Sequence, residues 1–238
     1  MSLFNGAPVL ITGGHTETAR AIALALARAG AGIALTGMPP ERIEDAAGEV
    51  LRAGGQALAL PADLTRPESA GQVIEQVIAS FGRIEILVLI SSVWGGGYLH
   101  EHNLLTWQRV LDANLNAPFY LLRRALQEMR RQRSGQVLVM NSESALDTYP
   151  MDGIYGVSLH ALDAMAQAAK VENASHGIRV TSLYTGVVLS PNSLSVGEPG
   201  LYPDEVARWA LACLSQPPEW SSPGPIRVVP GQEPLAGE

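Results

Sequence analysis

The sequence predicts an α/β fold, a doubly wound parallel sheet of about seven strands with helices on both faces. Short apolar runs alternate with longer segments of helical spacing, an order typical of repeated strand–helix units. The runs are almost continuously apolar, as expected of strands that are covered on both faces. The chain has 238 residues, 47% of them hydrophobic, with no linker or composition shift. We therefore expect a single domain over residues 1–238.

Each predicted strand is too short for a helix and is bounded by turn residues. In chain order the strands are Val9–Ile11, Ile33–Leu35, Ala57–Leu60, Ile86–Ile90, Val137–Met140, Val180–Leu183 and Ile226–Val229. The helices predicted between them are Ala19–Ala29, Glu41–Ala53, Glu68–Phe81, Trp107–Arg133, Tyr155–Asn173 and Asp204–Leu214. Residues Gly231–Glu238 have the composition of a polar tail.

Composition excludes several classes of function. Lys and Arg number 16 against 23 Asp and Glu, a net charge of −7, which argues against nucleic-acid binding as the main activity. Arg28 interrupts the longest apolar stretch, Ala21–Leu35, so no membrane span is predicted. The first residues lack the pattern of a secretory signal, and the single cysteine, Cys213, suits a reducing compartment. We expect a cytoplasmic protein.

A glycine turn joins the first predicted strand to the first helix. It reads Thr12-Gly13-Gly14-His15-Thr16-Glu17-Thr18-Ala19. Doubly wound folds hold a dinucleotide diphosphate at this turn. Small residues let the backbone approach the phosphates, and the amino end of the helix supplies N–H donors and a partial positive charge. The turn alone is a weak signal.

Four polar residues follow at fixed positions. Asp63 follows the third strand, and Asn114 lies within the predicted helix Trp107–Arg133. Ser142 ends the fifth strand, and Tyr155 opens the next helix thirteen residues later. Together with the glycine turn, these residues resemble the short-chain dehydrogenase/reductase family over essentially the whole chain.

The resemblance implies a Rossmann-type fold and an oxidoreductase that uses NAD or NADP on a small carbonyl or alcohol substrate, with no metal. It implies that Tyr155 donates or accepts the substrate proton, Ser142 orients the substrate oxygen and Asn114 holds a proton-relay water. Asp63 would contact the adenine. The implied cofactor-binding residues are Thr12, Gly13, Thr18, Asp63 and Gly186.

Simpler structural roles stand beside these. Ser142 and Tyr155 could form a buried hydrogen-bonded pair without chemistry, and Asn114 could be a polar residue that kinks its helix. Asp63 could cap the turn before Leu64-Thr65. The sequence leaves these alternatives open.

The chain also departs from the family pattern. Leu159 stands where the family has the lysine four residues after the tyrosine, and the neighbouring His160 should point elsewhere because one residue turns a helix by about 100°. Glu17 and Ala19 replace two motif glycines. The Asn-Asn-Ala-Gly after the fourth strand reads Leu89-Ile90-Ser91-Ser92, the Pro-Gly after the sixth reads Thr185-Gly186, and Pro191–Tyr202 is shorter than the usual substrate lid.

Two of these departures bear on chemistry. A phenol with an ordinary pKa of ~10 stays protonated at neutral pH, so loss of the lysine biases the chain toward carbonyl reduction. A carboxylate at position 17, some 4 Å from a diphosphate, would repel it by about 4 kcal/mol at an effective dielectric near 20, unless His15 or Arg20 offsets the charge. The carboxylate could also stabilise the amino end of its own helix.

The cofactor and the partners remain open at this stage. Thr36-Gly37-Met38-Pro39 follows the second strand without the acid that suits NAD or the arginine that suits NADP. The cofactor is therefore NAD, NADP or none. The helix from Tyr155 is apolar on more than one face, and relatives commonly pair subunits through it, so we expect a homo-oligomer or a hetero-oligomer with an active relative. The alternative to an enzyme is an inactive family member that serves as a structural or regulatory subunit.

Overall fold

Seven parallel strands form one sheet in the order β3-β2-β1-β4-β5-β6-β7. The computed structural model describes residues 3–90, 93–190, 199–217, 220 and 224–230. The strands are β1 (Pro8–Ile11), β2 (Gly32–Gly37), β3 (Gln56–Pro61), β4 (Ile86–Ile90), β5 (Gly135–Ser142), β6 (Ile178–Thr185) and β7 (Ile226–Val228). All seven predicted strands are confirmed. The expected polar tail, Ser91, Ser92 and residues 191–198 of the expected lid lie outside the described residues.

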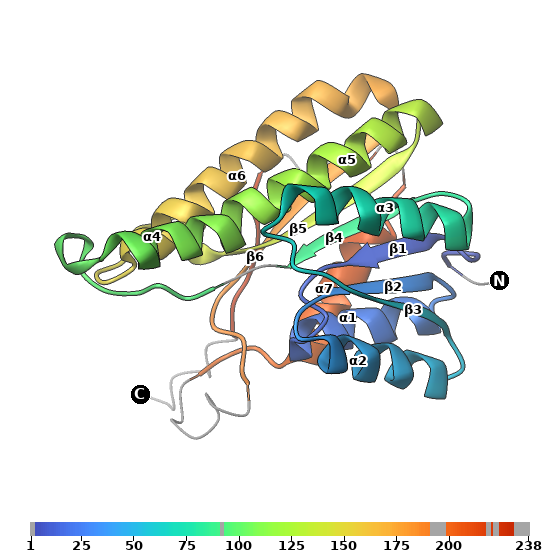
Figure 1. Ribbon diagram of the computed structural model, residues 1–238, viewed down its shortest axis with the longest axis horizontal. Coiled ribbons are helices and arrows are strands. Elements are labelled where there is room, and N and C mark those ends of the chain that lie inside the picture. Colours follow the sequence, from blue (N-terminus) through green and yellow to red (C-terminus); the bar gives the residue numbers. More distant parts are fainter. Residues whose placement is uncertain (1–2, 91–92, 191–198, 218–219, 221–223, 231–238) are drawn as a thin grey trace, which may run out of the picture.

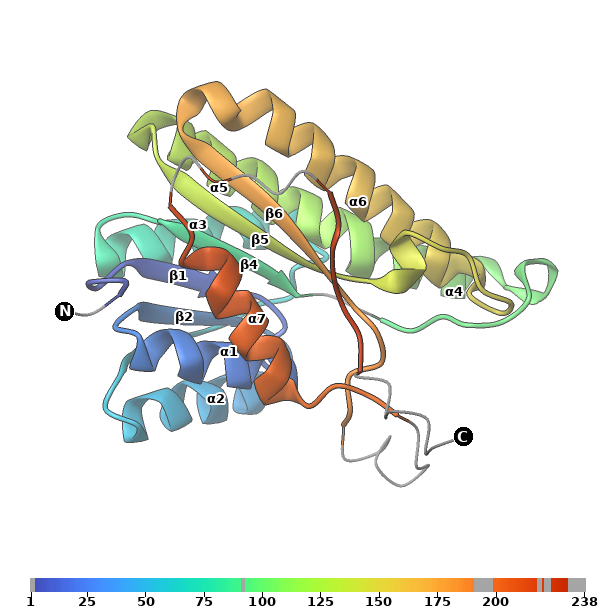
Figure 2. The same cartoon turned by 180° about the vertical axis from the view of Figure 1, so that it is seen from behind.

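Helices cover both faces of the sheet, as predicted (Figures 1 and 2). One face carries α1 (Glu17–Arg28), α2 (Pro40–Arg52) and α7 (Pro203–Leu214), and the other carries α3 (Pro67–Phe81), α5 (Ala117–Gln132) and α6 (Gly153–Asn173). Each face has its own apolar core, because both sides of the central strands are buried. In the described part of the chain, none of the helices combines the length and hydropathy that a bilayer crossing requires.

The predicted helix Trp107–Arg133 is confirmed as a helical segment, which runs from Leu104 to Gln132 and contains a π-helical turn that was not predicted. Helix α4 (Leu104–Leu111) begins where the Asn103 side chain accepts a hydrogen bond from the Thr106 N–H at 2.8 Å. A π-helical turn over Asp112–Asn116 then joins α4 to α5. Such wide turns occur often at functional sites, and this one contains Asn114.

The strand order places a crevice in the middle of the sheet. The chain runs outward from β1 to β3 and then returns past β1 to β4, so the direction of winding reverses between β1 and β4. In open α/β sheets, ligands bind outside the carboxyl ends of the strands at such a reversal. The residues that follow β1 and β4 are therefore expected to border a binding site.

Candidate active site

A cavity of about 900 Å³ opens at the carboxyl ends of the strands. Residues that follow or end β1, β2, β3, β4, β5 and β6 line it. Seven of the eight predicted site residues are among them: Thr12, Gly13, Thr18, Asp63, Ser142, Tyr155 and Gly186. The eighth, Asn114, is fully buried and does not line the cavity. The topology therefore gathers residues that are far apart in the sequence around one space.

The glycine turn is built for close approach of the backbone. Gly13 has a φ of +65°, and a Cβ atom there would lie 2.7 Å from the Ile90 carbonyl oxygen, so no other residue fits without a shift. Beside it, the Thr12 hydroxyl donates to the Ile90 oxygen at 2.9 Å and accepts from the Ile90 N–H at 2.7 Å. Thr12 thereby joins the ends of β1 and β4 at the edge of the cavity.

The amino end of α1 faces this turn. Thr16 caps the helix by accepting a hydrogen bond from the Ala19 N–H at 3.2 Å. The N–H groups of Glu17 and Thr18 occupy the first helical positions, where a helix offers no internal acceptor. Together with the helix dipole, these two groups form an anion-binding end.

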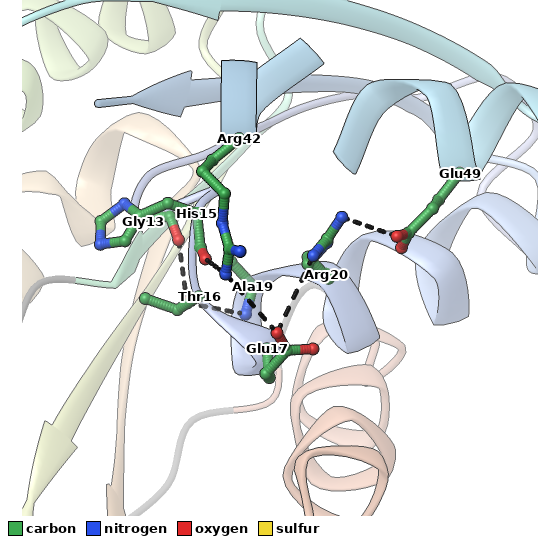
Figure 3. Close-up of polar contacts among 8 residues, drawn as sticks. All are labelled: Gly13, His15, Thr16, Glu17, Ala19, Arg20, Arg42 and Glu49. Atoms are coloured by element: carbon green, nitrogen blue, oxygen red, sulfur yellow. Dashed lines mark hydrogen bonds and ion pairs between the residues drawn. The ribbon is translucent and has the colours of Figure 1, made fainter. Parts of the chain in front are cut away.

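Glu17 does not stand alone at this end (Figure 3). Its carboxylate lies 3.8 Å from the guanidinium of Arg20 and 3.8 Å from that of Arg42. Arg20 also pairs with Glu49 at 2.6 Å, which fixes its position between the two carboxylates. Because two arginines share its charge, Glu17 repels an incoming phosphate less than an isolated carboxylate would.

His15 does not offset that charge, although the sequence suggested it as a candidate. Burial lowers the pKa of His15, and the nearby Arg42 guanidinium lowers it further, so the ring is neutral near pH 7. Arg20, the other expected candidate, does pair with Glu17, and so does Arg42, which also donates to the His15 carbonyl oxygen at 3.4 Å. Sequence reasoning missed Arg42 because it lies in the first turn of α2, beyond the residues directly after β2.

Ser142 and Tyr155 lie at the other end of the cavity. The Ser142 hydroxyl oxygen accepts a hydrogen bond from the Ser144 N–H at 3.3 Å, which leaves its hydrogen available to donate. The Tyr155 ring is 8% exposed and meets the Trp94 ring edge-on, with 4.7 Å between the ring centroids. Trp94 was not predicted from the sequence. The signal that could have indicated it is a tryptophan that follows the fourth strand and directly precedes three glycines.

Comparison with known proteins shows which family the chain belongs to. A family model described as short chain dehydrogenase matches residues 7–199. The chain belongs to the short-chain dehydrogenase family. A D-beta-hydroxybutyrate dehydrogenase of Rhizobium meliloti is 30% identical over 184 residues, covering 76% of this chain and 71% of the relative.

Solved structures of the family share the fold. A metagenomic short-chain oxidoreductase in complex with NADP has a TM-score of 0.84 at 24% identity and covers 98% of this chain and 100% of its own. An NAD⁺-bound xylitol dehydrogenase has a TM-score of 0.87 at 22% identity and covers 96% of this chain and 99% of its own. The seven-stranded Rossmann-type fold predicted from the sequence is thereby confirmed.

Leu159 occupies the cavity wall where the family resemblance places a lysine. Its side chain is 1% exposed and lies one helical turn after Tyr155. The Asn141 side chain donates to the Leu159 carbonyl oxygen at 3.3 Å, which ties the end of β5 to α6. His160 is exposed and its ring nitrogen contacts the Gly156 oxygen at 3.0 Å, so it does not replace the lysine.

Asn114 holds the backbone beside the cavity. Its side-chain oxygen accepts from the Val93 N–H at 2.7 Å, and its amide nitrogen donates to the Val93 oxygen at 3.0 Å and to Ser158 at 3.1 Å. These bonds occupy the Asn114 side chain and fix residue 93, one position before Trp94. The π-helical turn around it fits the helix-kink alternative.

Asp63 lines the cavity and also caps its own turn. Its carboxylate accepts from the Thr65 N–H at 3.1 Å and from the Thr65 hydroxyl at 2.6 Å. The Thr65 hydroxyl bond is the main reason that the pKa of Asp63 is lowered, and Arg66 contributes. Among the described residues, no three His, Cys, Asp or Glu side chains gather as a metal site would require.

Proposed function

We propose that this member of the short-chain dehydrogenase family is an NAD(P)H-dependent oxidoreductase that acts on a carbonyl or hydroxyl substrate. The observation that carries the proposal is the cavity itself. One end is bordered by the glycine turn and the amino end of α1, and the other by Ser142 and Tyr155. A dinucleotide site and a proton donor therefore share one space.

The residues at the first end fit a nicotinamide dinucleotide. The glycine at position 13 permits close approach, and the Glu17 and Thr18 N–H groups would hold the diphosphate. Asp63 would contact the adenine, and Gly186 at the end of β6 would border the nicotinamide. Structures of family members contain NADP and NAD, and this chain's preference between them stays open.

The chain's own residues would then handle the substrate oxygen. A reduced nicotinamide held at this site would supply the hydride for the carbonyl carbon, and Tyr155 would donate its phenolic proton to the carbonyl oxygen. Ser142 would orient that oxygen by donating its hydroxyl hydrogen. Trp94 packs against the Tyr155 ring and limits its rotation. Asn114 would position the backbone that holds a relay water.

Leu159 favours reduction over oxidation in this proposal. Oxidation requires a tyrosinate at Tyr155, and position 159 has no ammonium group to stabilise one. The same observation favours the second candidate function, an inactive subunit of an assembly. The two candidates differ first in whether the chain binds a dinucleotide.

The deciding experiment is a calorimetric titration of the purified protein with NADH and with NADPH. Micromolar binding of either supports the oxidoreductase and identifies the cofactor. A Gly13→Ala variant serves as the control, because its Cβ would collide with the Ile90 oxygen and should abolish binding. Absence of binding at millimolar dinucleotide would contradict the oxidoreductase and favour the subunit role.

We further propose that the chain acts as a single domain in the cytoplasm and forms a homo-oligomer. Small apolar residues form an exposed stripe along α6, at Val157, Ala164, Ala168 and Val171. Helices pack closely through such stripes, and a second copy of the chain would cover this one. A hetero-oligomer with an active relative is the alternative outcome.

A further inference from the structure

The charged side chains that line the cavity are unevenly distributed in sign. Among the described residues that line the cavity, none is Lys or Arg, while three are carboxylates: Asp63, Glu143 and Asp152. Asp63 is engaged by Thr65 in its own turn. The Asp152 carboxylate accepts from the Tyr149 N–H at 3.2 Å. Glu143 is the third carboxylate, and neither of these hydrogen bonds involves it.

Glu143 lies directly beside the residues proposed for catalysis. It follows Ser142 in the chain, and its carboxylate oxygen lies 3.3 Å from where a Cβ atom on Gly186 would be. The Gly186 N–H already donates to the Val228 oxygen at 3.0 Å, so it is not the partner of this carboxylate. Within the described part of the chain, no hydrogen bond or ion pair engages the Glu143 side chain.

Aromatic rings border the end of the cavity at which Ser142 and Tyr155 lie. Trp94 is 61% exposed, Tyr149 is 46% exposed, and both line the cavity. Exposed aromatic faces attract organic cations, and indole does so most strongly. A half-buried carboxylate with aromatic rings around the same space is a combination suited to an ammonium group.

We propose that the substrate is a ketone, or the corresponding alcohol, that carries an ammonium group, and that Glu143 binds this group. The inference rests on the proposed function, because the carbonyl must reach Tyr155 and Ser142. A substrate carboxylate finds no cationic side chain among the described lining residues and meets Glu143 instead. Selection therefore comes from attraction of cations and repulsion of anions.

Three nearly isosteric methyl ketones test the proposal. Dimethylaminoethyl methyl ketone is a cation near neutral pH, methyl isoamyl ketone is its uncharged counterpart, and levulinate is an anion. Each is titrated calorimetrically into the wild-type protein and into Glu143→Gln, and kcat/KM is measured with NADPH and NADH. The control is Glu172→Gln, which makes the same change of charge at an exposed position far along α6.

The wild type should bind and reduce the cationic ketone at least about tenfold better than the neutral one, with levulinate the poorest. Glu143→Gln should bring the ratio of cationic to neutral ketone close to one, whereas Glu172→Gln should keep it. Equal treatment of the three ketones, a preference for levulinate, or no binding of any ketone would overturn the inference. Failure of both dinucleotides to bind would overturn the proposed oxidoreductase instead, and the ketone titrations would still report on Glu143.

Discussion

At the scale of single residues, position 159 has the largest consequence for chemistry. A leucine there places an apolar side chain where the family resemblance places a lysine, so position 159 supplies no positive charge to the cavity wall. The side chain is almost fully buried and packs with the core formed by α5 and α6. Replacing it therefore tests both the chemistry and the cost of changing the packing.

We expect Leu159→Lys to tighten dinucleotide binding by about tenfold, the value of one added charge-assisted hydrogen bond. Alcohol oxidation should become measurable, because an ammonium group stabilises the tyrosinate. Unfolding free energy should fall by about 1–3 kcal/mol as apolar burial is lost. Calorimetry, steady-state kinetics and urea unfolding measure the three effects. Leu159→Met is the control. If Leu159→Lys binds the dinucleotide no more tightly than Leu159→Met, restoring the lysine does not restore a cofactor contact at this position.

His15 predicts a pH dependence with a definite sign. Its pKa is lowered in the folded chain, so below the ordinary pKa of ~6.5 the unfolded chain binds more protons than the folded one. Stability is therefore fully present above that value and falls as the pH falls through it. Urea unfolding at about pH 7.5 and about pH 5.5 should show a larger loss for the wild type than for His15→Gln. If the unfolding free energy falls equally in the two proteins, the pH dependence arises from groups other than His15.

At the scale of elements, the strands could be predicted because their burial is continuous. The runs around Ile33 and Leu87 have no polar face, and both sides of those strands are buried. The π-helical turn at Asp112–Asn116 could not be predicted, since apolar spacing does not reveal which carbonyl each N–H contacts. The ion pair between Glu17 and Arg42 could not be predicted either, because it joins two helices that come together only when the sheet folds.

The π-helical turn gives a prediction about Asn114. Substitution by leucine removes three hydrogen bonds and leaves the Val93 N–H and carbonyl without their partner. We expect Asn114→Leu to lower the unfolding free energy by about 2–4 kcal/mol. Asn116→Leu is the matched control in the same turn, because among the described residues the Asn116 side chain makes one hydrogen bond, a donation to Asp112 at 2.7 Å. Equal losses in the two variants under urea would contradict a special role for Asn114.

At the scale of the whole molecule, the sheet separates two apolar cores and leaves the cavity at their common edge. Seven of the eight predicted site residues line this cavity, because the family resemblance places them at strand ends and helix starts that meet at one edge of the sheet, whereas Asn114 does not line it. The proposed class of substrate could not be predicted from the sequence, since the proposal depends on the positions of Trp94 and Glu143 around the cavity. The exposed stripe on α6 poses the remaining question at this scale.

We expect the chain to associate with itself through α6. A chain of 25.2 kDa that pairs through this stripe should sediment as a dimer or a larger species at micromolar concentration. Ala168→Glu places a charge in the middle of the stripe and should shift the protein to monomer, because a buried unpaired carboxylate opposes association. Ala79→Glu, at an exposed position on α3, should leave the assembly unchanged. Sedimentation velocity is measured for the three proteins. A monomeric wild type would show that the chain does not self-associate, and an assembly that persists in Ala168→Glu would show that the interface lies elsewhere.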